Sequence, residues 1–291
     1  MISKGYQAIR TIYISIVGNL ILAIVKALTG FFGNSYALIA DAIESTSDIL
    51  SSVLVLLGLK YAHKPADKNH PYGHGKVEPL ITFIVVGFLI VSASVIAYGG
   101  IQNILTPHEL PRPYTLVVLG SIIIVKEIFY RVIIRKSEEI NSSSLKADAW
   151  HHRSDAITSL AAFLGISIAL ILGKGYETAD DWAALIASLA IFYNSYLIFR
   201  PAFGEIMDEH LYDELVNEIR KISENVEGIT GTEKCFVRKS GTHYHVDLHA
   251  TVNSNITVKA GHNIAHKLKD KLKKDLPQLT NVLIHIEPND L

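Results

Sequence analysis

The chain has 291 residues, of which 49% are hydrophobic and 19% are charged, and its formal net charge is -1. Its mean hydropathy of +0.28 is too high for most water-soluble domains and too low for a chain wholly buried in lipid. The near-neutral charge gives no bias toward nucleic acid. The single cysteine, Cys235, excludes an intrachain disulfide and a thiolate metal cluster. We therefore expect one part of the chain to lie in a membrane and another part in water.

Six apolar runs are long enough to cross a bilayer, whose hydrocarbon core needs about 20 helical residues. They cover roughly residues 8–32, 36–62, 78–105, 114–135, 143–172 and 179–200. The first run is long enough to span rather than to be removed, and it lacks the small-residue exit of a cleavable signal. The sequence thus predicts an α-helical membrane protein with a six-helix transmembrane domain over residues 1–205. Residues 206–291 are expected to form a water-soluble α+β domain.

Lysine and arginine near the ends of the apolar runs predict the orientation in the membrane. The loops TPHELPRP and GKGYETADD carry one such residue each, Arg112 and Lys174. The opposite side carries Lys4, Arg10, Lys60, Lys64, Lys68, Lys76, Arg131, Arg135 and Lys136. Both termini are therefore expected on the cytoplasmic side, which agrees with a lone cysteine kept reduced.

The second and fifth runs contain charged residues where lipid-facing sequence is expected. ADAIESTSD, residues 40–48, and ADAWHHRSD, residues 147–155, share one pattern. The positions that repeat are Asp41, Glu44 and Asp48 in the first segment and Asp148, His151 and Asp155 in the second. Residues three and four apart lie on one helix face, so each segment is expected to present a polar stripe. Two such stripes can face each other across a helix bundle.

A divalent cation would compensate these charges. One charge at the bilayer centre costs about 2.5 to 3.5 kcal/mol by insertion scales. Glu44, Asp48, His151 and Asp155 offer three carboxylates and one imidazole, a set that can close tetrahedrally around Zn²⁺. The lack of thiolates disfavours monovalent copper, and the imidazole disfavours Mg²⁺ and Ca²⁺. Fe²⁺, Co²⁺, Cd²⁺ and Mn²⁺ remain open.

The alternative is that these carboxylates only form a hydrogen-bond network or pair with nearby cations, namely Lys26, Lys146 or Arg153. Asp41 and Asp148 are expected to contact the ligands or to line the access path rather than to bind the ion directly. His152 and Arg153 lie around the helix from His151 and are expected to contact another helix or lipid headgroups.

The chain contains, in this order, ADAIESTSD, the loop PADKNHPYGHGKVEP and ADAWHHRSD. These three segments resemble those of the cation diffusion facilitator family, the proton-coupled exporters of zinc and other transition metals. The resemblance implies that the pairs Glu44/Asp48 and His151/Asp155 form the transport site between the second and fifth helices. It also implies homodimers that alternate between inward-open and outward-open states. Glu44 stands where relatives usually have His or Asp, so the chain departs from the family at a position that bears on metal preference.

The loop after the second run is a second candidate metal site. Asp67, His70 and His74 lie within eight residues, and the family resemblance places a bound ion on these three. A solvated polar loop is the alternative. The resemblance also gives Lys76 a charged contact near the start of the tail, with Asp208 as the expected partner.

From residue 208 onward, periodicity predicts the order α-β-β-α-β, which resembles the family's metallochaperone-like cytoplasmic domain. The first helix is LYDELVNEIRKISENV, with Leu211, Leu215, Ile219 and Ile222 at helical spacing. EKCFVRKSG and THYHVDLHATV are expected to form a hairpin, and NVLIHIEP a third strand. The second helix, TVKAGHNIAHKLKDKLKKDL, has an apolar face of Ile264, Leu268 and Leu272.

Histidine is frequent in this tail. His243, His245, Asp247 and His249 share one strand face by the period of two. The residues that match regulatory zinc positions of the family are His249, His262, His285 and Glu287, with Glu233 where a further histidine is expected. The alternative is a polar face that forms a dimer without metal.

The sequence therefore predicts a metal/proton antiporter that carries Zn²⁺, with the other four ions as alternatives. Ligands must lose their protons to bind metal, and His151 is the best candidate for the exchanged proton because imidazole titrates near neutral pH. Metal in the tail would tighten the homodimer and favour the inward-facing state.

The expected partners are a second copy of the chain, lipid and protons, without nucleic acid. The expected location is a bacterial or archaeal plasma membrane. A membrane metalloenzyme is disfavoured because the sequence contains no HExxH motif and no multi-histidine di-iron pattern. A membrane sensor that binds metal without moving it remains a second function class.

Overall fold

A computed structural model describes residues 2–106, 109–140, 143–241 and 243–289 of the chain. Within the helices, the side chains of residues 2–15, 59, 137, 139–140, 143–148 and 151 lie outside this description.

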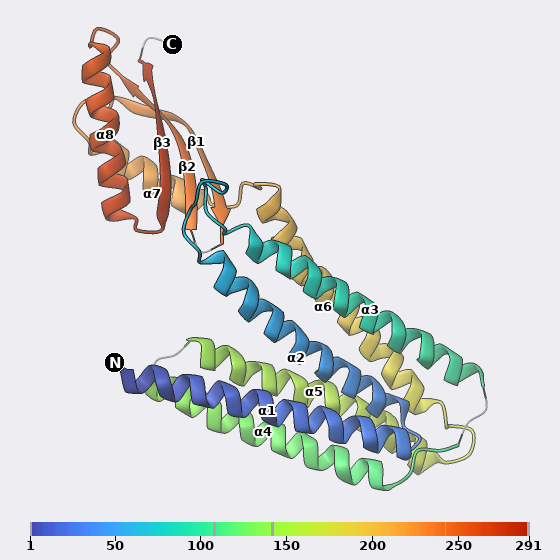
Figure 1. Cartoon of the computed structure of the whole chain (residues 1–291). Helices are drawn as coiled ribbons and strands as arrows, with labels where there is room; N and C mark the ends of the chain where they lie inside the picture. Colours follow the sequence, from blue (N-terminus) through green and yellow to red (C-terminus); the bar gives the residue numbers. More distant parts are fainter. Residues whose placement is uncertain (1, 107–108, 141–142, 242, 290–291) are drawn as a thin grey trace. The chain divides into compact units, whose positions relative to one another are not determined.

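The chain forms long helices first and a small sheet afterwards (Figure 1). The long helices are α1 (Ile2–Phe32), α2 (Tyr36–Ala62), α3 (Val77–Leu105), α4 (Tyr114–Ile140), α5 (Ser143–Leu172) and α6 (Ala179–Ile206). The tail comprises α7 (Asp213–Glu224), β1 (Gly231–Ser240), β2 (His243–Val252), α8 (Val258–Asp275) and β3 (Leu279–Pro288). The predicted helical membrane domain and the α-β-β-α-β tail are therefore confirmed.

The long helices follow the six predicted apolar runs, and four of them, α1, α3, α4 and α6, extend beyond the predicted bounds. In the described part of the chain, four segments are long and apolar enough to cross a membrane. These are Tyr36–Ala62, Val77–Leu105, His152–Leu172 and Ala179–Ile206. The described apolar part of α1, Ile16–Phe32, is shorter, and α4 carries several charged residues toward its end.

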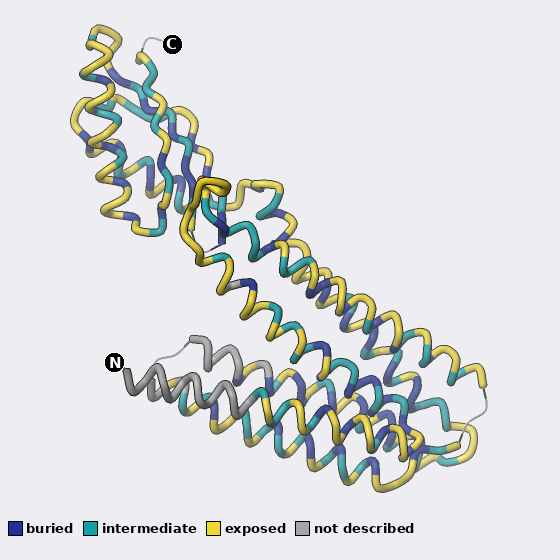
Figure 2. Tube along the Cα trace, in the orientation of Figure 1, coloured by how far each residue is buried: buried dark blue, intermediate teal, exposed yellow. Residues whose placement is uncertain are grey.

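Many large apolar side chains of these helices are exposed. Exposed residues recur along the described parts of the long helices (Figure 2). Ile171 is 80% exposed, Leu105 75% and Val117 70%, values that would be unfavourable in water. Lipid removes this cost because its tails are as apolar as these side chains. The exposure pattern thus agrees with helices that lie in a bilayer.

Packing divides the chain into two compact units, Met1–Leu54 with Val85–Leu197 and Val55–Ile84 with Ile198–Leu291. In the first unit, α1, α4 and α5 lie side by side (Figure 1). The expected boundary between residues 205 and 206 stays a prediction.

Two polar residues fix the start of α2. The Ser35 hydroxyl accepts from the Leu38 amide at 3.2 Å, an N-cap bond, and donates to Asp180 Oδ1 at 2.9 Å. The other oxygen of Asp180 accepts from the amide of Tyr36 at 2.5 Å and from that of Ala37 at 3.2 Å. Helix α2 therefore begins at a fixed place relative to α6, which sets the height of its polar stripe.

The tail is a three-stranded sheet with both tail helices on one face. Strand β1 pairs antiparallel with β2, and β2 pairs parallel with β3, in the order β1-β2-β3. The strand side chains on the helix face and those of α7 and α8 form one core. Its buried members are Val216, Ile219, Val226, Cys235, Val237, Val246, Leu248, Ala250, Leu268, Leu272, Leu276, Leu279 and Val282.

The predicted apolar faces of the tail helices were largely but not fully correct. Leu211 was expected in the first of these helices, yet it precedes α7 and is 61% exposed. Helix α7 begins two residues later, and Val216 takes a core position with Ile219. On α8, Leu268 and Leu272 are fully buried, whereas Ile264 is only partly buried.

Cys235 lies in the tail core, and this position predicts low reactivity. Its side chain is 6% exposed, and burial raises the pKa of its thiol to about 11. Because the thiolate is the reactive form, we expect maleimide labelling at pH 7.5 to be at least about 100-fold slower in the folded chain than in denaturant. Mass spectrometry of the full chain in detergent measures this rate. Fast labelling without denaturant would contradict the tail packing.

Candidate metal centres

The polar stripe of α2 begins with a buried ion pair. Lys26 Nζ on α1 lies 2.9 Å from Asp41 Oδ2, and both side chains are almost wholly buried. The same ammonium donates to Ser45 Oγ at 3.0 Å and to Ser159 Oγ at 3.1 Å. The Ser159 hydroxyl in turn donates to Asp41 Oδ2 at 2.8 Å. These bonds tie α1, α2 and α5 together, and they engage Asp41 in the pairing with Lys26 that the sequence left open.

The described carboxylates of the predicted transport site lie in one region. Glu44 is close enough to Asp48, Asp41 and Asp155 to interact with them electrostatically. Asp155 is 8% exposed, while Glu44 and Asp48 are partly buried. The packing of the first unit thus gathers three of the four predicted ligands. The side chains of His151 and Asp148 lie outside the described residues.

Lys126 on α4 is a residue that the sequence interpretation missed. Its side chain is 1% exposed, and its Nζ lies 2.5 Å from Asp155 Oδ2 and 2.8 Å from Asn19 Oδ1 on α1. A signal existed in the sequence, since Lys126 interrupts the apolar stretch SIIIVKEIF. An intramembrane lysine is costly and indicates a partner or a function.

His152 and Arg153 both contact α4. Arg153 Nη1 donates to the Tyr130 hydroxyl at 3.0 Å, and its guanidinium lies 4.7 Å from the centre of that ring. His152 is fully buried and meets the Phe129 ring edge-on at 5.3 Å between ring centres. Of the two expectations for these residues, the structure supports the interhelical one.

The loop between α2 and α3 brings its three predicted ligands together. Asp67 Oδ1 lies 3.1 Å from His70 Nδ1, and Asp67 Oδ2 lies 3.5 Å from His74 Nε2. One donor atom from each of the three residues falls within 4.8 Å of the others. The backbone amide of His70 donates to Asp67 and lowers the pKa of its carboxyl. The carboxylate therefore stays ionised at neutral pH, as a metal ligand must.

Helix α6 ends in a motif that presents Asp208 to Lys76. Asp208 has a φ of 53°, and the amide of Glu209 donates to the carbonyl of Gly204 at 2.9 Å, as in a Schellman C-cap. Lys76 Nζ donates to the Glu205 carbonyl at 2.6 Å and lies 2.7 Å from Asp208 Oδ1. The last carbonyls of a helix lack intrahelical partners, and Lys76 satisfies one of them. The expected contact between Lys76 and Asp208 is thus present.

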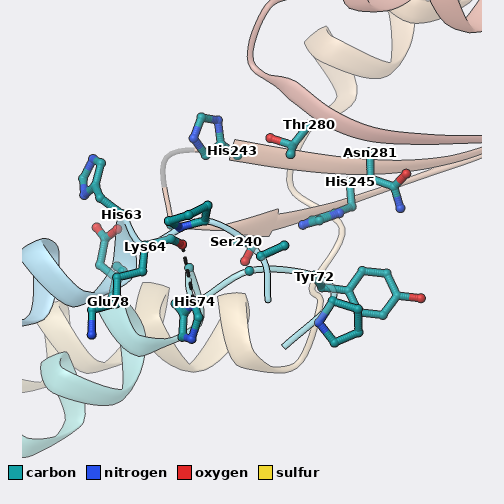
Figure 3. Close-up of a pocket in the computed structure, with 17 residues that line it drawn as sticks. His63, Lys64, Tyr72, His74, Glu78, Ser240, His243, His245, Thr280 and Asn281 are labelled. Atoms are coloured by element: carbon teal, nitrogen blue, oxygen red, sulfur yellow. Dashed lines mark hydrogen bonds between the residues drawn. The ribbon is translucent and has the colours of Figure 1, made fainter. Parts of the chain in front are cut away.

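A cavity of about 450 Å³ lies between the α2–α3 loop and the sheet, next to His74 (Figure 3). The β1–β2 turn and the beginning of β3 form its other wall. Glu78 Oε2 and His245 Nδ1 are buried there without a hydrogen-bond partner among the described residues. Burial lowers the pKa of His245, with Arg238 adding to the effect. His245 therefore stays neutral at neutral pH. Among the described residues, the ring nitrogens of His245 do not belong to the metal-binding cluster of the α2–α3 loop.

A second cluster lies on β2 and β3, where parallel pairing sets His249 directly opposite His285. His249 Nδ1 lies 2.6 Å from Glu287 Oε1, and His285 Nε2 lies 3.7 Å from the same oxygen. Within the described residues, the three groups have donor atoms within 4.8 Å of one another, and buried Glu287 Oε2 has no hydrogen-bond partner. Two imidazoles and a carboxylate are ligands that suit Zn²⁺.

The other two residues predicted for the tail site, Glu233 and His262, differ in their distance from this cluster. Glu233 lies close to Glu287. The hydrogen bond from His249 is the largest cause that lowers the pKa of the Glu287 carboxyl, and the contact with Glu233 is the next. His262 on α8 packs instead against His266, with 4.5 Å between ring centres. The structure does not bring His262 into the cluster of His249, His285 and Glu287.

Comparison with known proteins supplies the family. The family description "Cation efflux transmembrane domain" matches residues 12–207, and "Cation efflux protein, cytoplasmic domain" matches residues 211–289. The chain belongs to the cation efflux family, the cation diffusion facilitators. This cation efflux protein is accordingly a multi-pass integral membrane protein that exports divalent metal cations, and it is not an enzyme.

Relatives of this cation efflux protein match it over nearly its whole length. The manganese efflux system protein MneP of Bacillus subtilis (strain 168) is 31% identical over 294 residues, 99% of each chain. Metal tolerance protein 2 of Oryza sativa subsp. japonica is 33% identical over 97% of this chain and 79% of the relative. A solved structure titled "MamM-CTD 215-293" is 22% identical over 26% of this chain and 98% of that chain, with a TM-score of 0.26.

Replacing His285 in this cation efflux protein with alanine tests the tail cluster. Equilibrium dialysis of the full chain against Zn²⁺ is expected to show one bound ion fewer per chain, or an affinity lower by roughly 100-fold at one site. The reason is that one of three convergent donors is lost. His210→Ala is the matched control, because His210 is exposed and, among the described residues, pairs with Asp213. Unchanged stoichiometry and affinity in His285→Ala would show that the cluster binds no metal.

Proposed function

We propose that this chain exports a divalent transition-metal cation in exchange for protons, with Glu44, Asp48, His151 and Asp155 as the transport site. The observation that carries the proposal is the gathering of three carboxylates from α2 and α5 in one region of the membrane unit. Several carboxylates in a bilayer are costly without a cation to compensate them. A divalent ion that binds between two helices supplies that compensation.

Proton coupling follows from the chemistry of these ligands. Carboxylates and imidazole bind metal only when deprotonated, so an arriving ion displaces protons and returning protons displace the ion. An imidazole titrates near neutral pH, which makes His151 the residue proposed to exchange a proton. Asp41 is committed to Lys26 and Ser159, so we assign it to holding α2 in place rather than to binding the ion.

Zn²⁺ is the proposed cargo, because an imidazole joins the carboxylates in a set of four ligands. Mn²⁺ is the second candidate, and two observations favour it. A 31% identical relative is named a manganese efflux system protein. Three of the four proposed ligands are also carboxylates, which suit harder ions such as Mn²⁺.

The loop and tail clusters are proposed as sites outside the membrane. The carrier is proposed to work as a homodimer with both termini in the cytoplasm, in the plasma membrane of a bacterium or archaeon. The domain boundary is placed between residues 205 and 206. Metal bound by His249, His285 and Glu287 would then report the cytoplasmic metal concentration to the dimer and favour its inward-facing state.

Metal uptake into vesicles with an acidic lumen tests the proposal. Purified full chain is reconstituted, and initial rates are compared for Zn²⁺, Mn²⁺, Fe²⁺ and Cd²⁺ with and without the pH gradient. The expected result is uptake that the gradient accelerates, with Zn²⁺ fastest; Mn²⁺ fastest would select the second candidate. Binding of metal without uptake under any gradient would overturn transport and favour a membrane metal sensor.

A further inference from the structure

Lys126 and Lys26 are the largest fully buried side chains in the described part of the chain. Lys26 donates to three oxygens, one each from Asp41, Ser45 and Ser159, which uses all three hydrogens of its ammonium. Lys126 contacts Asn19 and Asp155 instead. Lys26 thus pairs with a carboxylate outside the proposed ligand set, whereas Lys126 pairs with a proposed ligand.

The contact engages one oxygen of Asp155 in particular. Lys126 Nζ lies against Oδ2, so the ammonium fixes the carboxylate from one side. Asn19 holds the ammonium from α1 at 2.8 Å, which keeps the charge beside α5. A fixed positive charge therefore contacts Asp155, a proposed ligand of the ion.

The charges of the proposed site then balance. Glu44, Asp48 and Asp155 contribute three negative charges when ionised, and Lys126 reduces the total to about two. A divalent cation brings this total close to zero, which avoids the cost of burying net charge. Without Lys126, the loaded site would keep one negative charge. It would then hold a divalent ion more tightly, because the repulsion between ammonium and metal would be gone.

We propose that Lys126 is a positioning residue that sets the charge of the transport site, so that a divalent cation binds weakly enough to be released. The inference rests on the proposed function and adds a residue to it. The ammonium acts by its charge. A carrier must release its cargo on every cycle, so excess affinity slows turnover just as weak affinity prevents loading.

Transport kinetics of charge variants test the proposal. Initial rates of Zn²⁺ and Mn²⁺ uptake are measured against metal concentration in vesicles with an acidic lumen. Lys126→Met is expected to lower the half-saturating metal concentration roughly tenfold or more and to lower the maximal rate. Lys126→Arg keeps the charge and is expected to restore near-native values of both. If Lys126 had only a structural role, Lys126→Met would lower the maximal rate without lowering the half-saturating metal concentration.

A second variant guards against misfolding of Lys126→Met. Asn19→Asp leaves Lys126 in place and sets a carboxylate beside its ammonium, which also makes the cluster more negative by one charge. It is expected to lower the half-saturating metal concentration, as Lys126→Met does. An unchanged or raised half-saturating concentration in the folded variants would overturn the role of Lys126.

Asp155→Ala separates this inference from the proposed function. Loss of uptake in Asp155→Ala together with native half-saturation in Lys126→Met and Asn19→Asp overturns only the role of Lys126. Native uptake in Asp155→Ala overturns the transport site itself and the inference with it. Loss of uptake together with tighter half-saturation in the two charge variants supports both.

Discussion

Replacing Asp48 with alanine is expected to lower the initial rate of metal uptake by more than about 100-fold. Asp48 lies one helical turn after Glu44 on α2, and the two carboxylates interact electrostatically in the structure. Removing one of four ligands leaves the ion an incomplete shell inside a bilayer, where water cannot easily replace the lost oxygen. Uptake of radioactive or dye-reported metal into vesicles measures the effect.

Thr46→Ala is the matched control for this prediction. Thr46 lies on the same helix two residues earlier, is exposed, and donates to the Ala42 carbonyl of its own helix. Its removal is expected to leave uptake near the native rate. Native uptake in Asp48→Ala would show that the ion crosses elsewhere, and loss of uptake in both variants would indicate damage to α2 rather than to the site.

Replacing Lys26 with methionine is expected to destabilise the membrane unit by about 3 to 5 kcal/mol. Its ammonium is fully buried and pairs with Asp41 at 2.9 Å, and the change leaves a buried carboxylate without its counter-charge. The hydroxyls of Ser45 and Ser159 lose a donor at the same time. Thermal or denaturant unfolding in detergent, followed by the fraction of protein that stays monodisperse, measures the loss.

The double variant Lys26→Met with Asp41→Asn is the control. It removes both charges, and replacing a buried pair as a whole is often near neutral. Recovery of most of the lost stability in the double variant would assign the effect to the unpaired carboxylate. A single variant as stable as the native chain would contradict the ion pair that ties α1 to α2.

Local patterns in the sequence predicted the elements and one of the metal clusters. The apolar runs gave the long helices, and the alternation around Ser240 and Gly241 gave the β1–β2 hairpin. The ligands of the loop cluster, Asp67, His70 and His74, are neighbours in the chain, so their convergence depends on local backbone alone. The period of two also put His249 and His285 on strand faces, where parallel pairing sets them opposite each other.

Features that depend on packing between distant elements were not predictable in the same way. Lys126 meets Asp155 because α4 and α5 lie side by side, and no pattern within α4 reveals which carboxylate faces it. His262 was assigned to the tail cluster by resemblance, but the structure pairs it with His266 on α8. Leu211 kept the helical spacing, yet α7 begins only at Asp213.

Exchange of metal for protons can be measured directly as a change of pH inside the vesicles. Vesicles that contain the full chain and a trapped pH-sensitive dye are given external Zn²⁺ or Mn²⁺ at equal pH inside and outside. We expect the lumen to become more alkaline as metal accumulates, because protons leave in exchange, and Asp155→Ala to show neither change. Metal accumulation without any change of luminal pH would contradict the antiport.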